Sequence, residues 1–191
     1  MTSLFKRARY FAILLLSLLF VIPPAGFSQD AILTNITVTN TRDDLLLYLN
    51  LEGAFREEMN KAILSGVPST FSFFAILNRT RNFWFDRSIA DIEVSHTIVY
   101  DNLKKEFTVK RSWKEDNPEV TKSFKEAKRW MTEITSLKII PLNRLEKGEQ
   151  YQLRVKAEVS KKTLPFYLHY ILFFVSLWDF ETDWYAIDFI Y

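Results

Sequence analysis

Hydrophobic and polar residues alternate along much of this chain in the way that is typical of β-strands. Apolar runs over Ile32–Val38 and Leu45–Leu51 are separated by the polar segment Asn40–Asp44, which predicts a β-hairpin. The cleanest alternation covers Tyr151–Val159, where apolar residues share one parity and Gln, Arg, Lys and Glu share the other. These segments predict strands with one buried and one solvent-facing side.

Strand-like patterns continue through the middle and the end of the chain. Both parities are apolar between Thr70 and Leu77, which predicts a strand buried on both faces. Ile92–Tyr100 alternates and is joined by a polar turn to a second alternating run, Phe107–Trp113, so a second hairpin is expected. The last residues, Trp184–Tyr191, predict an aromatic strand that pairs into the sheet or lies across it.

Helical spacing is found in two places. Apolar residues at i, i+4, i+7 and i+8 predict a helix over Phe55–Ser65, stopped by Gly66 and Pro68. A capping-box pair, Ser123 and Glu126, begins a second helix predicted over Ser123–Thr135. A third helix is predicted within Pro165–Trp178.

These elements predict an α+β fold. We expect a mostly antiparallel β-sheet or a two-layer β-sandwich, covered by two or three short helices. The sequence contains no repeat at a solenoid period and no low-complexity linker. Residues 29–191 are therefore expected to form a single globular domain.

The composition excludes several classes of protein. The 17 Phe, 8 Tyr and 5 Trp residues supply the apolar surface that disordered chains lack. The absence of cysteine excludes a disulfide scaffold, a zinc–thiolate site, an iron–sulfur cluster and a thiol nucleophile. Four glycines leave little room for a glycine-rich phosphate loop.

The N-terminus has the layout of a secretory signal peptide. Three cations precede the apolar stretch Tyr10–Ile22, which is followed by two prolines and small residues up to Ser28. The stretch is shorter than the roughly 20 residues of a membrane-spanning helix, so cleavage after residue 28 is favoured over retention as an anchor. Removal of residues 1–28 changes the net charge from +2 to −1, which gives no indication of nucleic-acid binding. The expected location is the periplasm, with membrane association as an open alternative.

No catalytic, metal-binding or cofactor-binding residue is predicted. His96 has the apolar parity of a strand and is interpreted as a hydrogen-bonded core histidine, while His169 is a weaker candidate for lining a site. Three carboxylates, Asp179, Glu181 and Asp183, share one parity and could form an acid–base pair or a cation site. A solvent-exposed strand face explains the same pattern better, so a hydrolase built on these residues is the least favoured of three functional hypotheses.

Arginines and aromatic residues are interleaved near the middle of the chain. Arg79, Arg81 and Arg87 surround Phe83, Trp84 and Phe85. This pattern could bind an anionic glycan or a nucleic-acid single strand. An ordinary sheet surface with stacked arginines is the favoured interpretation, and no nucleic-acid partner is predicted.

Short motifs, in a fixed order, cover nearly all of the chain after the signal: Gly53-Ala54-Phe55, Ser65-Gly66-Val67-Pro68, Tyr100-Asp101-Asn102-Leu103, Phe124-Lys125-Glu126-Ala127, Leu164-Pro165 and Trp178-Asp179-Phe180-Glu181-Thr182-Asp183-Trp184. In this order and spacing the chain resembles an uncharacterised exported bacterial family, domain-of-unknown-function family 4390. The resemblance implies a Gram-negative envelope location, no assigned catalytic residue, and a sensor histidine kinase as a signalling partner.

The aromatic C-terminal region, Leu164–Tyr191, provides the main functional hypothesis. On a helix, its large apolar side chains would point in nearly every direction around the axis. Burial of one side of the helix would therefore leave some of them exposed. The region is either a central part of the core or a surface that meets a lipid, an acyl ligand or a partner protein. The candidate surface residues are Phe166, His169, Tyr170, Phe173, Trp178 and Trp184.

Two functional classes follow from this surface. The first is a non-enzymatic periplasmic interaction module that docks a membrane-protein partner or the membrane surface. The alternative is a carrier of a lipid or another apolar small molecule, in which the sheet and the last segment enclose a pocket.

Overall fold

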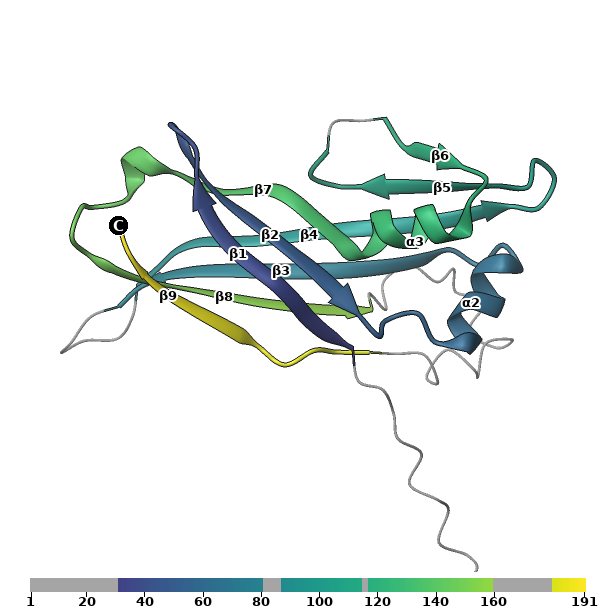
Figure 1. The fold of residues 1–191 in the computed structure, drawn as a ribbon, viewed down its shortest axis with the longest axis horizontal. Helices are drawn as coiled ribbons and strands as arrows, with labels where there is room; N and C mark the ends of the chain where they lie inside the picture. The colour runs from purple at the N-terminus through teal and green to yellow at the C-terminus, as the bar shows by residue number, and fades with distance from the viewer. Residues whose placement is uncertain (1–30, 81–86, 115–116, 160–179) are drawn as a thin grey trace, which may run out of the picture.

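The computed structural model describes residues 31–80, 87–114, 117–159 and 180–191, which form two antiparallel β-sheets (Figure 1). The smaller sheet has the order β1-β2-β7, with bounds Ile32–Asn40, Asp44–Glu52 and Glu133–Pro141. The larger sheet has the order β6-β5-β4-β3-β8-β9, with bounds Glu119–Thr121, Glu106–Arg111, Arg87–Asp101, Ser69–Arg79, Gln150–Val159 and Tyr185–Ile190. The predicted α+β class with mostly antiparallel strands is confirmed.

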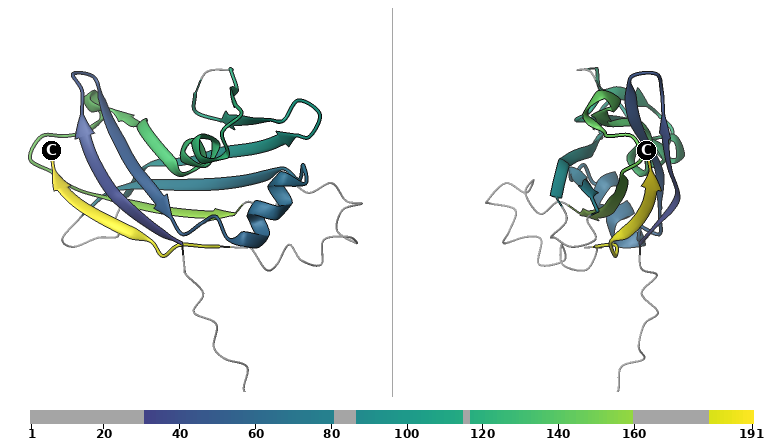
Figure 2. Two further views of the ribbon diagram at one scale, coloured as in Figure 1. Left: turned by 45° about the vertical axis from the view of Figure 1, so that its right-hand side comes forward. Right: turned by 90° about the vertical axis from the view of Figure 1, so that its left-hand side faces the viewer.

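The two sheets form the layers of a sandwich. The strands of the three-stranded sheet run diagonally across the six-stranded sheet, and the edge-on view separates the two layers (Figure 2). The core lies between them: β3 and β8 direct alternate side chains inward that are at most 2% exposed, namely Phe71, Phe73, Ala75, Leu77, Tyr151, Leu153, Val155 and Ala157. The buried apolar side chains of both sheets belong to one cluster.

Both predicted hairpins are present. In the turn between β1 and β2, the Thr41 hydroxyl accepts a hydrogen bond from the Asp44 N–H over 3.0 Å. In the turn between β4 and β5, the Asp101 carboxylate accepts hydrogen bonds from the N–H groups of Leu103 and Lys104. These two bonds lower the pKa of Asp101, because they favour its charged form.

The faces of β3 differ from the prediction in one respect. The first five residues, Ser69–Phe73, are buried on both sides, as expected. From Phe74 onward the outward-facing residues Phe74 and Ile76 are only half-buried. The outer face of the six-stranded sheet therefore carries apolar side chains that remain partly exposed.

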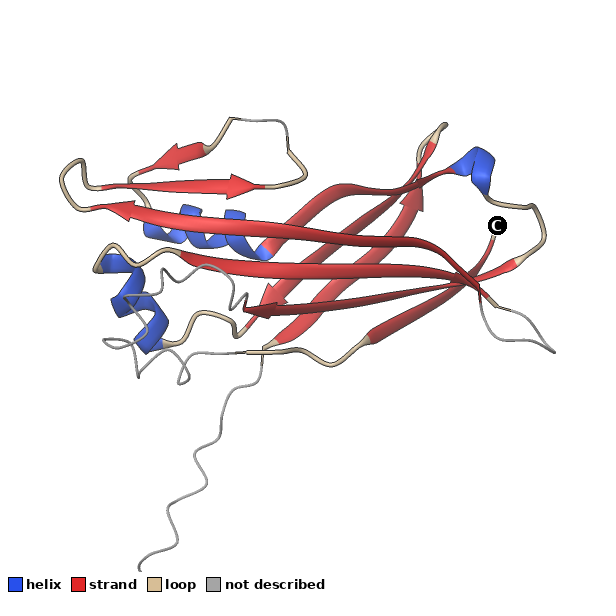
Figure 3. Ribbon diagram, turned by 180° about the vertical axis from the view of Figure 1, so that it is seen from behind, coloured by secondary structure: helices blue, strands red, loops and turns tan. Residues whose placement is uncertain are grey.

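The helix α2 (Glu57–Leu64) lies at one end of the sandwich, seen from behind in Figure 3, and ends where the sequence predicted. The Val67 N–H donates to the Ala62 carbonyl over 3.0 Å and the Gly66 N–H donates to the Ile63 carbonyl over 2.8 Å, which is a Schellman motif. Gly66 has a φ of +89°, a conformation that glycine adopts without strain. Met59 and Ile63 are the buried residues of this helix.

The helix α3 (Phe124–Thr132) begins as predicted but ends earlier than the expected Thr135. Strand β7 starts at Glu133, so Ile134 is a strand residue that pairs with Leu49 of β2. Ile134 follows Met131 at helical spacing, which is why the pattern extended the helix. Two adjacent β-branched residues, Ile134 and Thr135, favour the extended conformation, and pairing with β2 fixes it.

Removal of the cap of α3 should destabilise the protein measurably. The Ser123 hydroxyl accepts a hydrogen bond from the Glu126 N–H over 3.3 Å. Because Ser123→Ala leaves that N–H without its partner, we expect the free energy of unfolding to fall by about 1 kcal/mol in urea denaturation. Ser136→Ala, on an exposed hydroxyl outside any helix, is the matched control and should change it by less than about 0.5 kcal/mol. Equal losses would contradict the capping role.

The chain leaves the described residues at the end of β8 and returns beside it. The Val159 N–H donates to the Phe180 carbonyl over 3.0 Å, and the Thr182 N–H donates to the Ala157 carbonyl over 2.9 Å. Strand β9 then pairs with β8 as the edge strand, so the predicted terminal strand is confirmed. The helix predicted within Pro165–Trp178 lies outside the described residues.

Candidate functional site

Trp184 is the one member of the predicted interaction surface that lies in the described part of the chain. It precedes β9 and is 39% exposed. Its indole ring contacts two cations of β8: the Arg154 guanidinium carbon lies 4.8 Å and the Lys156 Nζ 5.7 Å from the ring centroid. Phe166, His169, Tyr170, Phe173 and Trp178 lie outside the described residues.

The strand register places further apolar side chains on the same face of the sheet, on the other side of β8 from Trp184. Lys156 pairs with Phe74 of β3, and Arg154 pairs with Ile76. Directly paired residues of antiparallel strands project from the same face of a sheet. We call the resulting surface the Trp184 patch and define it by its residues: Phe74, Ile76, Arg154, Lys156 and Trp184.

The cations of the patch are held by hydrogen bonds and ring contacts. The Lys156 ammonium lies 2.5 Å from a Glu181 carboxylate oxygen and 3.2 Å from one of Glu158. The hydrogen bond with Glu181 is the main cause of a raised pKa for Lys156. Lys156 therefore keeps its charge at neutral pH, and its position under the indole is fixed from two sides.

The acidic residues near the C-terminus alternate with buried residues. Phe180 and Thr182 are 6% and 4% exposed, whereas Glu181 and Asp183 are exposed. Glu181 and Asp183 are therefore exposed, as the sequence favoured, but they lie in the segment before β9 and not on the face of a strand, and Asp179 lies outside the described residues. Among the described residues, no group of three or more His, Cys, Asp or Glu side chains is arranged to hold a metal ion.

His96 is a hydrogen-bonded core histidine, as predicted. Its side chain is fully buried, the Trp113 indole N–H donates to Nε2 over 2.9 Å, and Nδ1 lies 2.9 Å from the Met131 carbonyl. Because Nε2 accepts, Nδ1 carries the proton and donates to that carbonyl. Burial lowers the pKa of His96 to about 4, and the nearby charges of Arg111 and Lys114 act in the same direction. With both ring nitrogens occupied, this histidine does not present a base to solvent.

The predicted cluster of arginines and aromatics is only partly described, because residues 81–86 lie outside. Arg79 and Arg87 stand opposite each other in the register of β3 and β4. With Arg144, which follows β7 in the 3-10 turn η1 (Leu142–Arg144), they line a pocket of about 250 Å³. Arg144 could not be predicted from the sequence, since only the tertiary structure brings this turn to the ends of β3 and β4.

A second pocket, of about 580 Å³, lies along the β8–β9 edge and is lined by Thr80, Gln150, Tyr151, Gln152, Asp188, Phe189 and Ile190. Both pockets therefore carry charged or hydrogen-bonding side chains on their walls. A predominantly apolar lining is what an acyl chain requires. The carrier hypothesis consequently has no supporting observation in the first pocket, whose lining is mainly polar, whereas the second pocket also presents the apolar side chains of Phe189 and Ile190.

None of the helices in the described residues has the length and apolarity needed to cross a membrane. No curated protein and no solved structure matches this chain. One family model does match, over residues 28–188, and its description is "Domain of unknown function (DUF4390)". Since the match covers all but the last residues of the described sandwich and most of the sequence, the chain belongs to the DUF4390 family.

Proposed function

We propose that this protein is a non-enzymatic interaction module of the Gram-negative cell envelope. It is exported to the periplasm by the N-terminal signal and docks a membrane surface or a membrane-protein partner through its aromatic C-terminal region. The Trp184 patch is the described part of that docking surface. A sensor histidine kinase is the membrane-protein partner that the family resemblance suggests.

The observation that carries this proposal is the composition of the Trp184 patch. An exposed indole stands above two long cationic side chains, beside half-buried Phe74 and Ile76. Tryptophan beside arginine suits the boundary between lipid headgroups and hydrocarbon, because the ring enters the apolar layer while a cation such as Arg154 stays among the phosphates. Trp and Arg are also enriched at the centres of protein interfaces.

The position of the start of β1 supports a docking role for the segment that leads into β9. The start of β1 and this segment lie side by side in the view of Figure 1 and in the turned views of Figure 2. In the sequence, the N-terminal apolar stretch ends at Ile22, ten residues before β1 begins at Ile32, and the family match begins at residue 28, next to the predicted cleavage position. An uncleaved signal would thus hold the start of β9 near the membrane.

Trp184→Ala tests the proposal. Protein produced from the full chain is assayed for flotation with vesicles of phosphatidylglycerol and phosphatidylethanolamine, and for cross-linking to membrane proteins in intact envelopes. We expect vesicle binding or partner cross-linking to weaken by about fivefold or more, because an indole at the centre of an interface contributes more than 1 kcal/mol. Unfolding curves establish that the variant is folded.

Ile190→Ala is the matched control. Like Trp184, Ile190 is an exposed apolar residue, but it lies in β9, is 67% exposed and does not belong to the Trp184 patch. Its removal should leave both assays within about twofold of the unmodified protein. If Trp184→Ala changed neither vesicle binding nor any membrane-protein cross-link, the proposed docking role of the patch would be wrong.

A further inference from the structure

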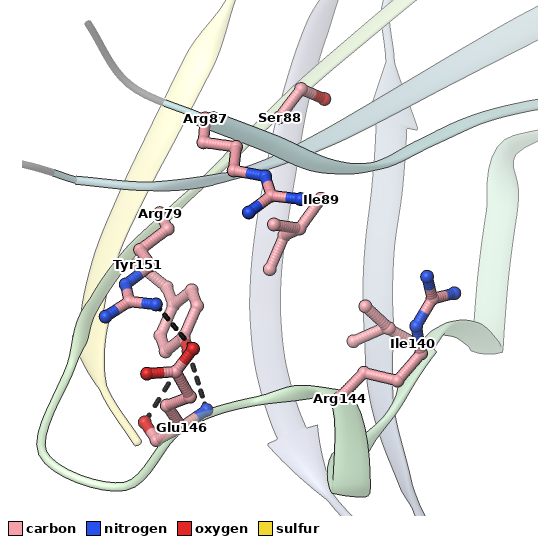
Figure 4. A pocket seen from close by; sticks show the side chains of 8 residues that line it. All are labelled: Arg79, Arg87, Ser88, Ile89, Ile140, Arg144, Glu146 and Tyr151. Atoms are coloured by element: carbon pink, nitrogen blue, oxygen red, sulfur yellow. Dashed lines mark hydrogen bonds and ion pairs between the residues drawn. The ribbon is translucent and has the colours of Figure 1, made fainter.

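The pocket of about 250 Å³ lies at the end of the sandwich where β3 ends and β4 begins (Figure 4). Its walls come from three parts of the chain: the ends of β3 and β4, the turn after β7, and the start of β8. The lining residues are Arg79, Arg87, Ser88, Ile89, Ile140, Arg144, Glu146 and Tyr151. Three guanidinium groups therefore line one small space.

Arg79 forms a fixed wall of this pocket. Its Nη1 lies 2.6 Å from a carboxylate oxygen of Glu146, and its Nη2 lies 2.8 Å from one of Glu149. The Glu146 backbone is held in turn, since its N–H donates to the Tyr151 hydroxyl over 2.8 Å. Tyr151 is 2% exposed, so this hydrogen bond ties the loop to the core. The charge of Arg79 is thus compensated by Glu146 and Glu149, and these three residues form a rigid side of the pocket.

Arg87 and Arg144 are in a different situation. Neither forms an ion pair with a described carboxylate, although both line the pocket. Arg87 stands directly opposite Arg79 in the strand register, and like charges in that position destabilise a sheet. The five charged residues around the space, three arginines and two glutamates, leave a net charge of +1. A bound anion would neutralise that charge and relieve the repulsion between the facing arginines.

The shape of the site favours a phosphate group. Arg87 reaches into the space from β4, while Arg144 lies across from it on the turn after β7 (Figure 4). A tetrahedral phosphate has oxygens pointing in several directions, so it can meet guanidinium groups on different walls, whereas a carboxylate presents two oxygens in one plane. The volume accommodates a phosphate and a few further atoms but lies below the 300–1,000 Å³ typical of larger ligands. Ile89, Ile140 and the Tyr151 ring supply apolar contacts for those further atoms.

We propose that this pocket binds a phosphate-type oxyanion through Arg87 and Arg144, with Arg79 as the fixed third wall. The anion is either free phosphate or a phosphate carried by a lipid headgroup, since both present the same oxygens. The inference does not depend on the Trp184 patch, which is built from different side chains.

The test is an NMR titration of the protein produced from the full chain with inorganic phosphate at constant ionic strength. We expect saturable shifts of the Ser88, Ile89 and Ile140 amide signals. The double substitution Arg87→Ala and Arg144→Ala should raise the dissociation constant at least about tenfold, since charge-assisted bonds are lost from two walls. Replacement of both residues by lysine keeps the charge but removes the guanidinium forks, and should give an intermediate value.

Lys147→Ala is the matched control. Lys147 is an exposed cation on the same loop, three residues after Arg144, and it does not line the pocket. We expect it to change the dissociation constant by less than about twofold, because charge on the loop alone is screened by salt. All of these substitutions are at exposed side chains, and thermal unfolding verifies that each variant is folded.

Vesicles distinguish the two sources of phosphate. Arginine-dependent binding to phosphatidylcholine vesicles that contain phosphatidic acid, without saturable binding of inorganic phosphate, supports a lipid-borne phosphate. Saturable binding of inorganic phosphate that depends on both arginines supports the free anion. The proposal is overturned if neither probe gives an arginine-dependent response, if acetate binds as tightly as phosphate, or if Lys147→Ala weakens binding as much as the double substitution.

Discussion

Phe71→Ala is expected to lower the free energy of unfolding by about 3–5 kcal/mol, the largest effect of any single substitution that we propose. The Phe71 ring is fully buried on the inner side of β3. Its centroid lies 5.2 Å from that of Phe55, before α2, and 5.0 Å from that of Phe180, before β9. Truncation removes both ring contacts and leaves a cavity where the entry to α2, the centre of the sheet and the start of the last strand meet.

Urea denaturation of Phe71→Ala and of Phe74→Ala measures this effect against a matched control. Phe74 is on the same strand but projects from the outer face, where it is half-buried. Its loss should reduce the free energy of unfolding by about 1 kcal/mol, because part of that ring already contacts water. Equal losses for the two variants would show that the inner and outer faces of β3 are wrongly assigned.

The second large effect is a loss of stability in acid that originates at His96. Burial lowers the pKa of this imidazole to about 4, against an ordinary value of 6.5. Between these two values the unfolded chain binds a proton that the folded chain does not, so the free energy of unfolding decreases as the pH falls from 6.5 to 4. The contribution of His96 over this window is about 3 kcal/mol, and it is fully present above pH 6.5.

Urea denaturation at several pH values between 7.5 and 4 tests this prediction. The glutamine in His96→Gln cannot titrate in this range, so the free energy of unfolding of this variant should decrease much less between pH 6.5 and 4. Its free energy of unfolding at neutral pH should be lower than that of the unmodified protein, because the hydrogen bond with Trp113 is disturbed. His169→Gln removes the other histidine of the chain and should keep the steep dependence of the unmodified protein. Parallel curves for His96→Gln and the unmodified protein would contradict the assignment of the acid response to His96.

The sequence predicts a strand most clearly where the period of two is undisturbed. β8 alternates without interruption over Tyr151–Val159, and the structure places its apolar parity inward. β7 was not predicted, because its pattern is broken: Ser136 has a φ of +62°, and the register with β2 shifts on both sides of Leu46 and Leu47. Such irregularities change which side chains face the core, so Leu137, Ile139 and Ile140 are all buried without alternating.

The two surface sites differ in how far they could be predicted. Trp184 was a candidate from the aromatic pattern alone, but its stacking on Arg154 and Lys156 depends on the pairing of β8 with β9. The pocket beside Arg79 and Arg87 depends on Arg144, which is more than 50 residues away in sequence. Local periodicity contains no information on such contacts, because they arise only when the two sheets pack together.

The backbone hydrogen bonds between the end of β8 and the segment before β9 have a consequence for the pairing of the edge strand. A shift of one residue between paired strands would turn every side chain of the edge strand to the opposite face of the sheet. Because Phe180 and Thr182 are already fastened to Val159 and Ala157, the register of β9 is set where this segment enters the sheet. The sandwich therefore guards its last strand against mispairing before that strand begins.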